Sequence, residues 1–332
     1  MPYNRRSFLN LIARSEPRTD DSWLHVSRTA MACRFEVTLP RSEENGVVAA
    51  TEALDEIDRL EAQLTVFRDS SEVSYVNAHA SDGPVEVSPS LFELLKLCKQ
   101  LYEATHQCFD ITSGPLTRCW GFLRRSGQLP DKTEIDSALS FVGSEKLIFD
   151  DTRRTISFGL PGMEINLGSI GKGYALDLAA QLISNDVKTA LLNAGASSMR
   201  AVGTGDGGEG WVVGLRHPRS KFRRLGVVRL RDCSLSTSGN EEQFFEYAGR
   251  RFSHIIDPRS GWPSESVTSV SVVAPDGALS DALATAFFVG GRQLAEEYCA
   301  QHPEVLVIML ESNSQAPVVI GKSSSCDGLR DF

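Results

Sequence analysis

Strand-like and helix-like segments follow one another in this sequence without regular alternation, and this order restricts the fold more than any other feature. Residues 34–39 alternate apolar and polar side chains, as a half-buried strand does, and residues 46–66 carry apolar side chains at helical spacing. Helical spacing recurs over residues 89–106, with Ser88 as the expected cap. Residues 146–158 contain a predicted hairpin. Because a doubly wound sheet needs strict strand–helix alternation, the sequence predicts an α+β fold.

The second half of the chain is expected to consist mainly of strands. Sheet is also expected to dominate residues 127–159. The predicted strands cover about residues 190–192, 211–215, 227–230, 243–247, 252–256, 267–273 and 305–309, and the predicted helices cover about 173–183, 281–289 and 293–302. We expect an arm over residues 1–21, one domain over residues 22–312 and a loose polar tail over residues 313–332.

Composition excludes some classes of function. The chain has 332 residues, and 41% of them are hydrophobic, which is enough for a sizeable core. The formal net charge is -9, so no basic footprint for nucleic acid is expected and nucleic acid is not predicted as a partner. Seven scattered cysteines without a C-x-x-C pair argue against a disulfide framework or a structural zinc site.

The N-terminus resembles part of an export signal. Arg5-Arg6-Ser7-Phe8-Leu9 is similar to the core of a twin-arginine signal, but residues 10–21 lack the apolar stretch and cleavage site that such a signal needs. No run of 18 apolar residues occurs in the sequence. These features favour the cytoplasm, with export by the twin-arginine-like N-terminus as the alternative.

Asp281 and Thr285 stand four residues apart in a predicted helix. This spacing brings a carboxylate and a hydroxyl to the same helix face. Magnesium prefers such hard oxygen ligands and takes its remaining ligands from water and phosphate. The alternative is structural: Asp281 would favour the helix dipole, and Thr285 would return a hydrogen bond to the backbone.

A glycine-rich turn, Gly168-Ser169-Ile170-Gly171-Lys172-Gly173, precedes another predicted helix. Its backbone N–H groups and the Lys172 ammonium suit an anion such as phosphate. The spacing matches neither a Walker loop nor a Rossmann fingerprint. Such a turn is also common as a purely structural element.

His254 lies where a predicted apolar strand runs into the turn Asp257-Pro258. A histidine there fits a proton acceptor that titrates near neutral pH. A core histidine bonded to a backbone carbonyl is the alternative. The turn Phe109-Asp110-Ile111-Thr112 offers an aromatic ring and polar groups to a planar ligand, although such turns are common.

Taken in order, these segments resemble the FAD:protein FMN transferase family of the ApbE type, over about residues 31–291. The matching segments are residues 64–77, Cys108 to Leu116 with Trp120-Gly-Phe122, Asn166 to Asp177, Thr237-Ser-Gly239, His254 to Pro258, and Asp281 to Thr285. The resemblance implies two related α+β halves of the T-fold type, with the active site between them.

The resemblance also implies a role for individual residues. Magnesium would be held by Ser169, Asp281 and Thr285, and His254 would take the proton of the acceptor, with Lys172 stabilising the phosphate. FAD, as the substrate, would contact Met31, Phe67, Cys108, Phe109, Asp110, Asn166, Lys172 and Ile255. The acceptor would be a threonine of another flavoprotein, often an electron-transport subunit at the membrane.

Three departures from the family pattern stand out in this sequence. Ala32 replaces a glycine, Asn166 replaces an aspartate, and Ala196-Ser197 interrupts a glycine-glycine-aspartate run. The metal pair and the histidine remain, so the sequence favours magnesium-dependent transfer of FMN from FAD to a protein, with release of AMP. A magnesium-dependent FAD pyrophosphatase and a non-catalytic FAD-binding protein are the two alternatives.

Overall fold

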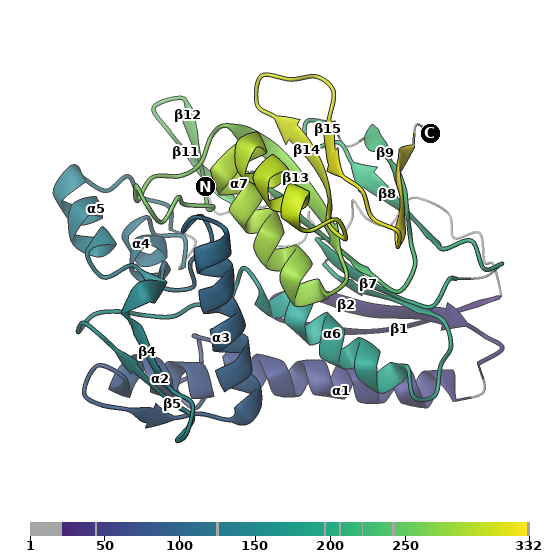
Figure 1. Ribbon diagram of the computed structural model, residues 1–332, viewed down its shortest axis with the longest axis horizontal. Coiled ribbons are helices and arrows are strands. Elements are labelled where there is room, and N and C mark those ends of the chain that lie inside the picture. The colour runs from purple at the N-terminus through teal and green to yellow at the C-terminus, as the bar shows by residue number, and fades with distance from the viewer. Residues whose placement is uncertain are drawn as a thin grey trace, which may run out of the picture.

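The computed structural model describes residues 22–330, apart from residues 44, 124–125, 196, 206, 221 and 241–242. The predicted N-terminal arm and its twin-arginine-like segment therefore lie outside the described residues. The fold is mixed α/β, as the irregular order of segments predicted (Figure 1). The T-fold-like duplication stays a prediction.

An eight-stranded antiparallel sheet forms the centre of the molecule. In spatial order its strands are β1 (Trp23–Ala30), β2 (Cys33–Pro40), β6 (Ala190–Ala194), β7 (Ser198–Val202), β10 (Ser234–Gly239), β13 (Val267–Ala274), β14 (Leu306–Glu311) and β15 (Val318–Gly321). All eight residues of β13 are buried. This strand is therefore covered on both faces, which explains why its sequence is a continuous apolar and small-residue run.

Three helices cover one face of this sheet (Figure 1). They are α1 (Gly46–Leu64), α6 (Gly171–Ile183) and α7 (Gly277–Gln301), and they bury the largest apolar cluster against the sheet. The other face carries a three-stranded sheet of β8 (Trp211–Arg216), β9 (Arg224–Leu230) and β16 (Cys326–Arg330), with a second apolar cluster between the sheets.

Smaller elements flank the ends of the helices. They are α2 (Glu72–His79), β3 (Val85–Glu86), α3 (Pro89–Ala104), α4 (Gly114–Cys119), α5 (Lys132–Leu139), the 3-10 turn Ser144–Lys146, and the hairpin of β4 (Leu147–Asp150) and β5 (Thr155–Phe158). A second hairpin, β11 (Phe244–Tyr247) with β12 (Arg250–Ser253), packs its aromatic rings on Trp120.

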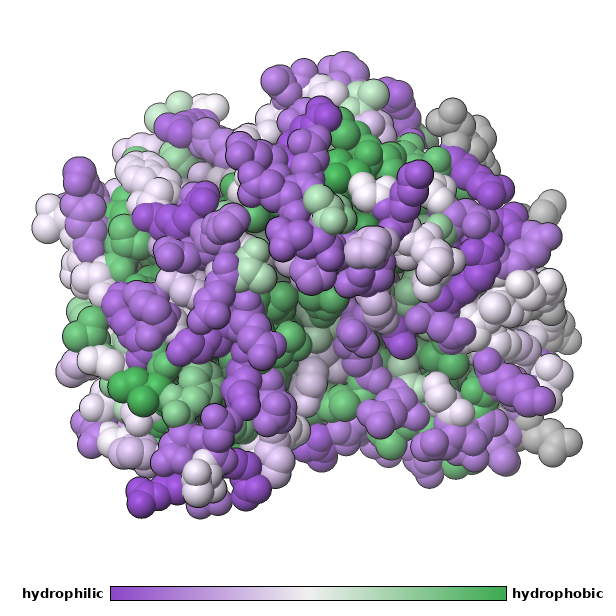
Figure 2. Space-filling model, in the orientation of Figure 1, coloured by the Kyte–Doolittle hydropathy of each residue, from purple (hydrophilic) through white to green (hydrophobic). Residues whose placement is uncertain are grey.

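On the face of the molecule that Figure 2 shows, hydrophobic residues are interspersed among polar ones. Within the described ranges, no helix combines the length and the apolar character that crossing a bilayer would require.

The structure confirms the two early helices, the Ser88 cap and the hairpin over residues 146–158. It corrects the expectation that sheet dominates residues 127–159, because Asp131 caps α5 there through a capping box. It also corrects the loose tail: Val318 to Gly321 pairs with β14, and Cys326 packs in the second apolar cluster. The predicted helix at residue 281 begins earlier, at Gly277.

Candidate active site

A cavity of about 1090 Å³ opens between the helix ends and the β11–β12 hairpin. Its size is at the upper end of the range for small-molecule sites, so it suits a ligand as large as a dinucleotide. The cavity collects almost every site residue predicted from the sequence: Met31, Phe67, Cys108, Asp110, Asn166, Ser169, Lys172, His254, Ile255, Asp281 and Thr285.

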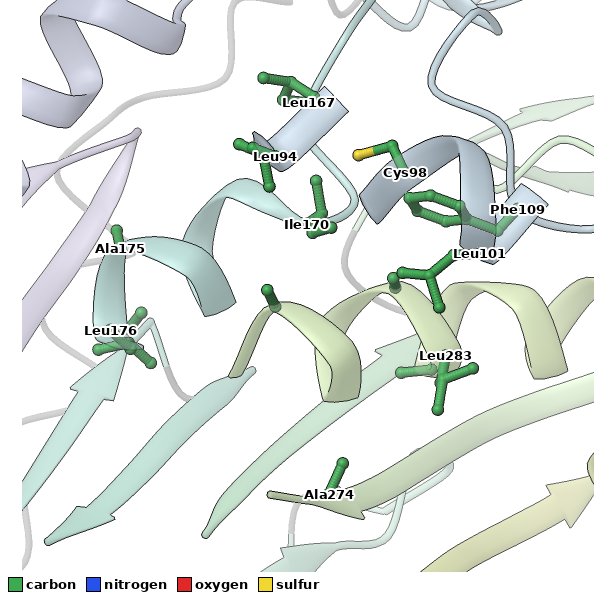
Figure 3. Packing of buried hydrophobic residues seen from close by; sticks show 14 of the residues in the cluster. Leu94, Cys98, Leu101, Phe109, Leu167, Ile170, Ala175, Leu176, Ala274 and Leu283 are labelled. Atoms are coloured by element: carbon green, nitrogen blue, oxygen red, sulfur yellow. The ribbon is translucent and has the colours of Figure 1, made fainter. Parts of the chain in front are cut away.

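Phe109 is the exception among the predicted site residues. Its side chain is 1% exposed, does not line the cavity, and packs near Cys98 and Leu101 (Figure 3). Phe67, by contrast, is 72% exposed and lies on the cavity wall. Of these two aromatic rings, only Phe67 presents a face on which a planar ligand can stack.

The N-terminal ends of α6 and α7 meet at the cavity and satisfy each other's backbone amides. The Gly173 N–H donates to Asp281 Oδ2 at 3.0 Å, and the N–H groups of Gly277 and Ala278 donate to the two oxygens of Asp177 at 2.7 and 2.8 Å. Each helix thus supplies a carboxylate that caps the other. Burial raises the pKa of Asp177 to about 6, against the effect of these hydrogen bonds.

Glycine is required for this close helix approach. A Cβ on Gly173 would lie 1.9 Å from the carbonyl oxygen of Gly277, and one on Gly277 would lie 2.4 Å from the carbonyl oxygen of Gly173. Neither backbone can give way, because both belong to packed helices. The glycine of the predicted phosphate turn is therefore needed to position α7, and with it Asp281.

Asp281 and Thr285 both face the cavity from successive turns of α7. Ser198 Oγ donates to Asp281 Oδ1 at 3.3 Å, and the Thr285 hydroxyl lies 3.3 Å from Ser238 Oγ and 3.4 Å from the Asp281 carbonyl oxygen. Among residues 22–330, apart from the gaps given above, no group of three or more His, Cys, Asp or Glu side chains could hold a metal ion. A cation here would therefore need hydroxyl, water or ligand oxygens besides Asp281.

Lys172 lies in the first turn of α6 and is fixed by a buried serine. Its Nζ donates to Ser197 Oγ at 2.6 Å, and Ser197 is only 7% exposed. The Ser197 carbonyl in turn accepts the N–H of Thr237 at 2.7 Å, which ties this contact to β10. An ammonium group held by a neutral hydroxyl keeps its charge available to an anionic ligand.

His254 follows β12 and has a defined tautomer. Its Nδ1 lies 2.9 Å from the Gln243 carbonyl oxygen, and its backbone N–H donates to the same oxygen. Because a carbonyl can only accept, Nδ1 carries the proton and Nε2 is the free acceptor. Burial lowers the pKa of His254, the Gln243 hydrogen bond opposes this, and the charge of Lys172 lowers it further. The ring is thus neutral at pH 7, as a general base must be.

The β1–β2 hairpin presents a strained tip to the cavity. Ala30 pairs with Cys33, so Met31 and Ala32 form a two-residue turn, and both have positive φ, 47° and 59°. The Met31 N–H donates to Glu61 Oε1 at 2.9 Å, which anchors the tip to α1. Alanine in this conformation is unfavourable relative to glycine, so the departure at Ala32 adds strain at the cavity wall.

Asp110 and Asn166 use their side chains mainly to shape the backbone. Asp110 Oδ1 accepts from the N–H and hydroxyl of Thr112 and from the Ser144 hydroxyl, and Asn166 Oδ1 accepts the Gly168 N–H at 2.9 Å. Burial raises the pKa of Asp110. Burial also raises the pKa of the Cys108 thiol to about 11, so Cys108 is a protonated wall residue rather than a nucleophile.

Sequence reasoning did not assign several residues that line the cavity. Thr237, Ser238 and Gly239 were noticed as a motif but given no role, and Ser197 was noticed only as part of a departure from the family pattern, whereas Glu61, Arg216 and Gln243 were given no role. Gln243 orients His254 through its backbone carbonyl oxygen. Because every residue has such a carbonyl, the sequence gives no sign of this role. Ser197 is recognisable only from its contact with Lys172.

Comparison with known proteins places this chain in a family. The model of the ApbE family matches residues 31–309. The FAD:protein FMN transferase of Treponema pallidum (strain Nichols) is 33% identical over 287 residues, which cover 81% of this chain and 77% of that protein. A protein of the same name from Klebsiella pneumoniae (strain 342) is 32% identical over 263 residues, 77% of this chain and 80% of that protein.

Solved structures agree as well. The crystal structure of the ApbE protein from Thermotoga maritima has a TM-score of 0.82 and 28% identity, and the match covers 91% of this chain and 97% of that chain. The flavin transferase ApbE from Vibrio cholerae, with a TM-score of 0.78 and 24% identity over 91% of this chain and 97% of that chain, shares the fold. The family match and the shared fold lead to one conclusion: this chain belongs to the ApbE family.

Proposed function

We propose that this chain is a flavin transferase that cleaves the pyrophosphate of FAD and moves the FMN half onto a threonine hydroxyl of another protein, with release of AMP. Relatives at 32% and 33% identity are named FAD:protein FMN transferase. The observation that carries the proposal is the joint presence, in one cavity, of a neutral histidine, a lysine ammonium and the Asp281–Thr285 pair.

His254 is the proposed general base. Its Nε2 accepts the threonine proton as the hydroxyl oxygen forms a bond to the FMN phosphorus, while the bond from this phosphorus to the bridging oxygen breaks and AMP leaves. The Gln243 carbonyl keeps the ring oriented during this step and stabilises the imidazolium that results. The proton that the threonine hydroxyl of the acceptor loses is thus the proton that the His254 ring gains.

Lys172 is the proposed anion contact, and the N-terminal end of α6 adds the positive end of its helix dipole. Ser197 holds the Lys172 ammonium at the cavity wall. These groups favour the pyrophosphate in the bound state and the charge that develops on phosphorus. Phe67 is the proposed stacking surface for the flavin ring.

The oxygens of Asp281, Thr285 and Ser169 fit magnesium, because they are hard donors that line the same cavity and leave positions for water and phosphate oxygens. Bound magnesium would supply charge neutralisation at the pyrophosphate. The proposed acceptor residue is a threonine, and the proposed acceptor is a flavoprotein such as a membrane electron-transport subunit.

Intact-mass measurement tests the proposal. The protein is incubated with FAD, Mg²⁺ and a synthetic peptide that carries one threonine in a Ser-Gly-Ala-Thr segment. A mass gain equal to FMN with release of AMP supports transfer. Free FMN with an unmodified peptide indicates a pyrophosphatase, and intact FAD indicates a binding protein; either result overturns transfer to this acceptor class.

Asp281→Ala tests the metal site in the same assay. We expect the transfer rate to fall by about 10²-fold or more, because an acidic ligand and the Gly173 contact are lost together. Asp276→Ala is the matched control, since Asp276 is exposed at the same helix end and does not line the cavity. Undiminished transfer by Asp281→Ala would remove the metal role. Urea unfolding of both variants separates this role from a loss of folding.

A further inference from the structure

One loop of this acidic protein has the opposite charge. Residues 216–224 contain five Lys or Arg residues and no Asp or Glu, whereas the whole chain has a net charge of -9. Arg216, Arg223 and Arg224 are exposed. The side chain of Phe222 is 99% exposed, the highest value among the large hydrophobic side chains of the described residues. Apart from residue 221, which the structure does not describe, the loop is thus a basic surface with an exposed aromatic ring.

The basic loop is anchored rather than loosely attached. Arg219 donates to the carbonyl oxygens of Ser312 and Ser314 at 2.7 and 2.9 Å and to the Thr268 hydroxyl at 3.0 Å, which fixes the loop to the ends of β13 and β14. The His217 N–H donates to the Arg223 carbonyl, which closes the loop. Burial, followed by the charges of Arg223 and Arg219, lowers the pKa of His217, as expected beneath a concentrated positive charge.

The loop begins at the cavity. Arg216, the last residue of β8, lines the cavity wall together with Phe244 of the β11–β12 hairpin. Transfer to a protein requires a macromolecule to bring a hydroxyl into this cavity and so to cover its rim. Arginine and aromatic side chains are the residue types enriched at protein interfaces.

We propose that the basic loop over residues 216–224 docks an acidic stretch of the acceptor protein beside the target hydroxyl. The inference rests on the proposed function, since it concerns the partner of the same site. Charge complementarity argues for an acidic partner: the net charge of -9 on this chain repels such a partner, whereas the arginines of the basic loop attract it. Such rim charges act mainly on association and on its salt dependence. Phe222 would add apolar contact beside the guanidinium groups.

Peptide binding tests the loop independently of catalysis. Two fluorescent peptides share one Ser-Gly-Ala-Thr segment and differ only in a following run of glutamates or glutamines, and anisotropy gives the Kd of each for the full-length protein. We expect the acidic peptide to bind roughly tenfold more tightly at low salt, and this preference to shrink as salt is added. Equal affinities would overturn the proposal.

Arg223→Glu and Phe222→Ser are the test variants, and Arg153→Glu is the matched control. Arg153 lies in the turn between β4 and β5, and Figure 1 shows these two strands at the lower left, away from β8 and β9 at the upper right. We expect Arg223→Glu to weaken the acidic peptide by roughly three- to tenfold and the control to leave it unchanged. The Kd of FAD should stay constant in all three variants. Equal binding by wild type and Arg223→Glu contradicts the proposal.

Two further readouts separate the outcomes. Mass gain on the bound peptide reports FMN transfer, so loss of binding selectivity and loss of chemistry are scored separately. Vesicles of phosphatidylcholine with phosphatidylserine test an anionic lipid surface as the occupant. If Arg223→Glu abolishes vesicle binding but leaves the acidic-peptide affinity unchanged, the loop is a membrane contact and the acceptor proposal fails.

Discussion

Two parts of the cavity wall are built in opposite ways. The α6–α7 part consists of buried backbone: Gly173 and Gly277 are in direct contact, and Asp177 and Asp281 cap the two helices. The rim consists of exposed side chains, Phe67 and Arg216 among them. In the first part, binding groups cannot change without disturbing the fold. At the rim, side chains can be replaced with little effect on folding, so substitutions there change mainly which ligand or partner the cavity binds.

Loss of the base is the largest effect that we expect. His254→Ala should lower the transfer rate by roughly 10²- to 10⁴-fold, because the threonine proton loses its acceptor. His79→Ala, at an exposed histidine of α2, is the control and should transfer at the wild-type rate. A transfer rate within twofold of wild type for His254→Ala would show that the hairpin side of the cavity serves binding only.

The pH dependence of transfer sharpens the same point. The pKa of His254 lies below its usual 6.5, so the rate should be constant above neutral pH and fall as pH drops through the folded-state pKa. The free energy of unfolding should change in the same direction. Below about pH 6.5 the unfolded chain binds more protons at His254 than the folded chain does, so the stability that the neutral His254 contributes to the folded state is lost as the pH falls through the folded-state pKa. A rate that rises on acidification contradicts the base assignment.

Gly173→Ala probes the buried helix contact. The new Cβ would lie 1.9 Å from the Gly277 carbonyl oxygen, so α7 must shift, and we expect a loss of about 3 kcal/mol in the free energy of unfolding. Gly171→Ala, two residues earlier in the same helix, meets no atom within 4 Å and should be neutral or slightly stabilising. Urea denaturation compares the two variants, and equal stabilities would show that the helix ends are not tightly packed.

Phe67→Ala tests the exposed part of the wall. We expect the KM for FAD to rise roughly five- to tenfold through loss of stacking, with the free energy of unfolding nearly unchanged because the ring is 72% exposed. Tyr75→Ala, an exposed aromatic of α2 away from the cavity, should change neither quantity. A marked loss of stability in Phe67→Ala would mean that this part of the wall is structural too.

Ala32→Gly gives the smallest expected effect. Glycine adopts the φ of 59° without the steric cost that alanine pays, and its greater freedom in the unfolded chain offsets part of the gain, so we expect about 0.5 kcal/mol of stabilisation. Ala30→Gly, in the adjoining strand, should destabilise instead. Thermal unfolding measures both, and a destabilised Ala32→Gly would show that the turn is not strained.

The sequence was informative where local pattern determines structure. The buried apolar face of α1, the Ser88 cap, and Asp281 with Thr285 four residues later on one helix face are local features. The structure has each of them where the sequence pattern predicted it. It was uninformative where long-range pairing decides. Strand β7 is short, and it is stabilised by its neighbours β6 and β10 rather than by its own residues. Residues 318–321 form a strand only because β14 offers them an edge.

The same limit explains the site. The sequence led us to expect His254 and Lys172 at the site from their chemistry, and both line the cavity, whereas the Phe109 side chain lies in the core, because an aromatic residue in a turn can face either the core or a ligand. The Gln243 carbonyl and the Ser197 hydroxyl act through position alone. Such groups become visible only after the chain has been folded in three dimensions.

The mutual capping of α6 and α7 also bears on how the protein matures. About a hundred residues separate Asp177 from the amides that it caps, and the same holds for Asp281 and Gly173. Because α7 follows α6 along the chain, the Gly173 amide cannot meet the Asp281 carboxylate until α7 has been synthesised and has docked. A nascent chain that ends before residue 281 therefore lacks part of the cavity lining, and the cavity is completed late in synthesis.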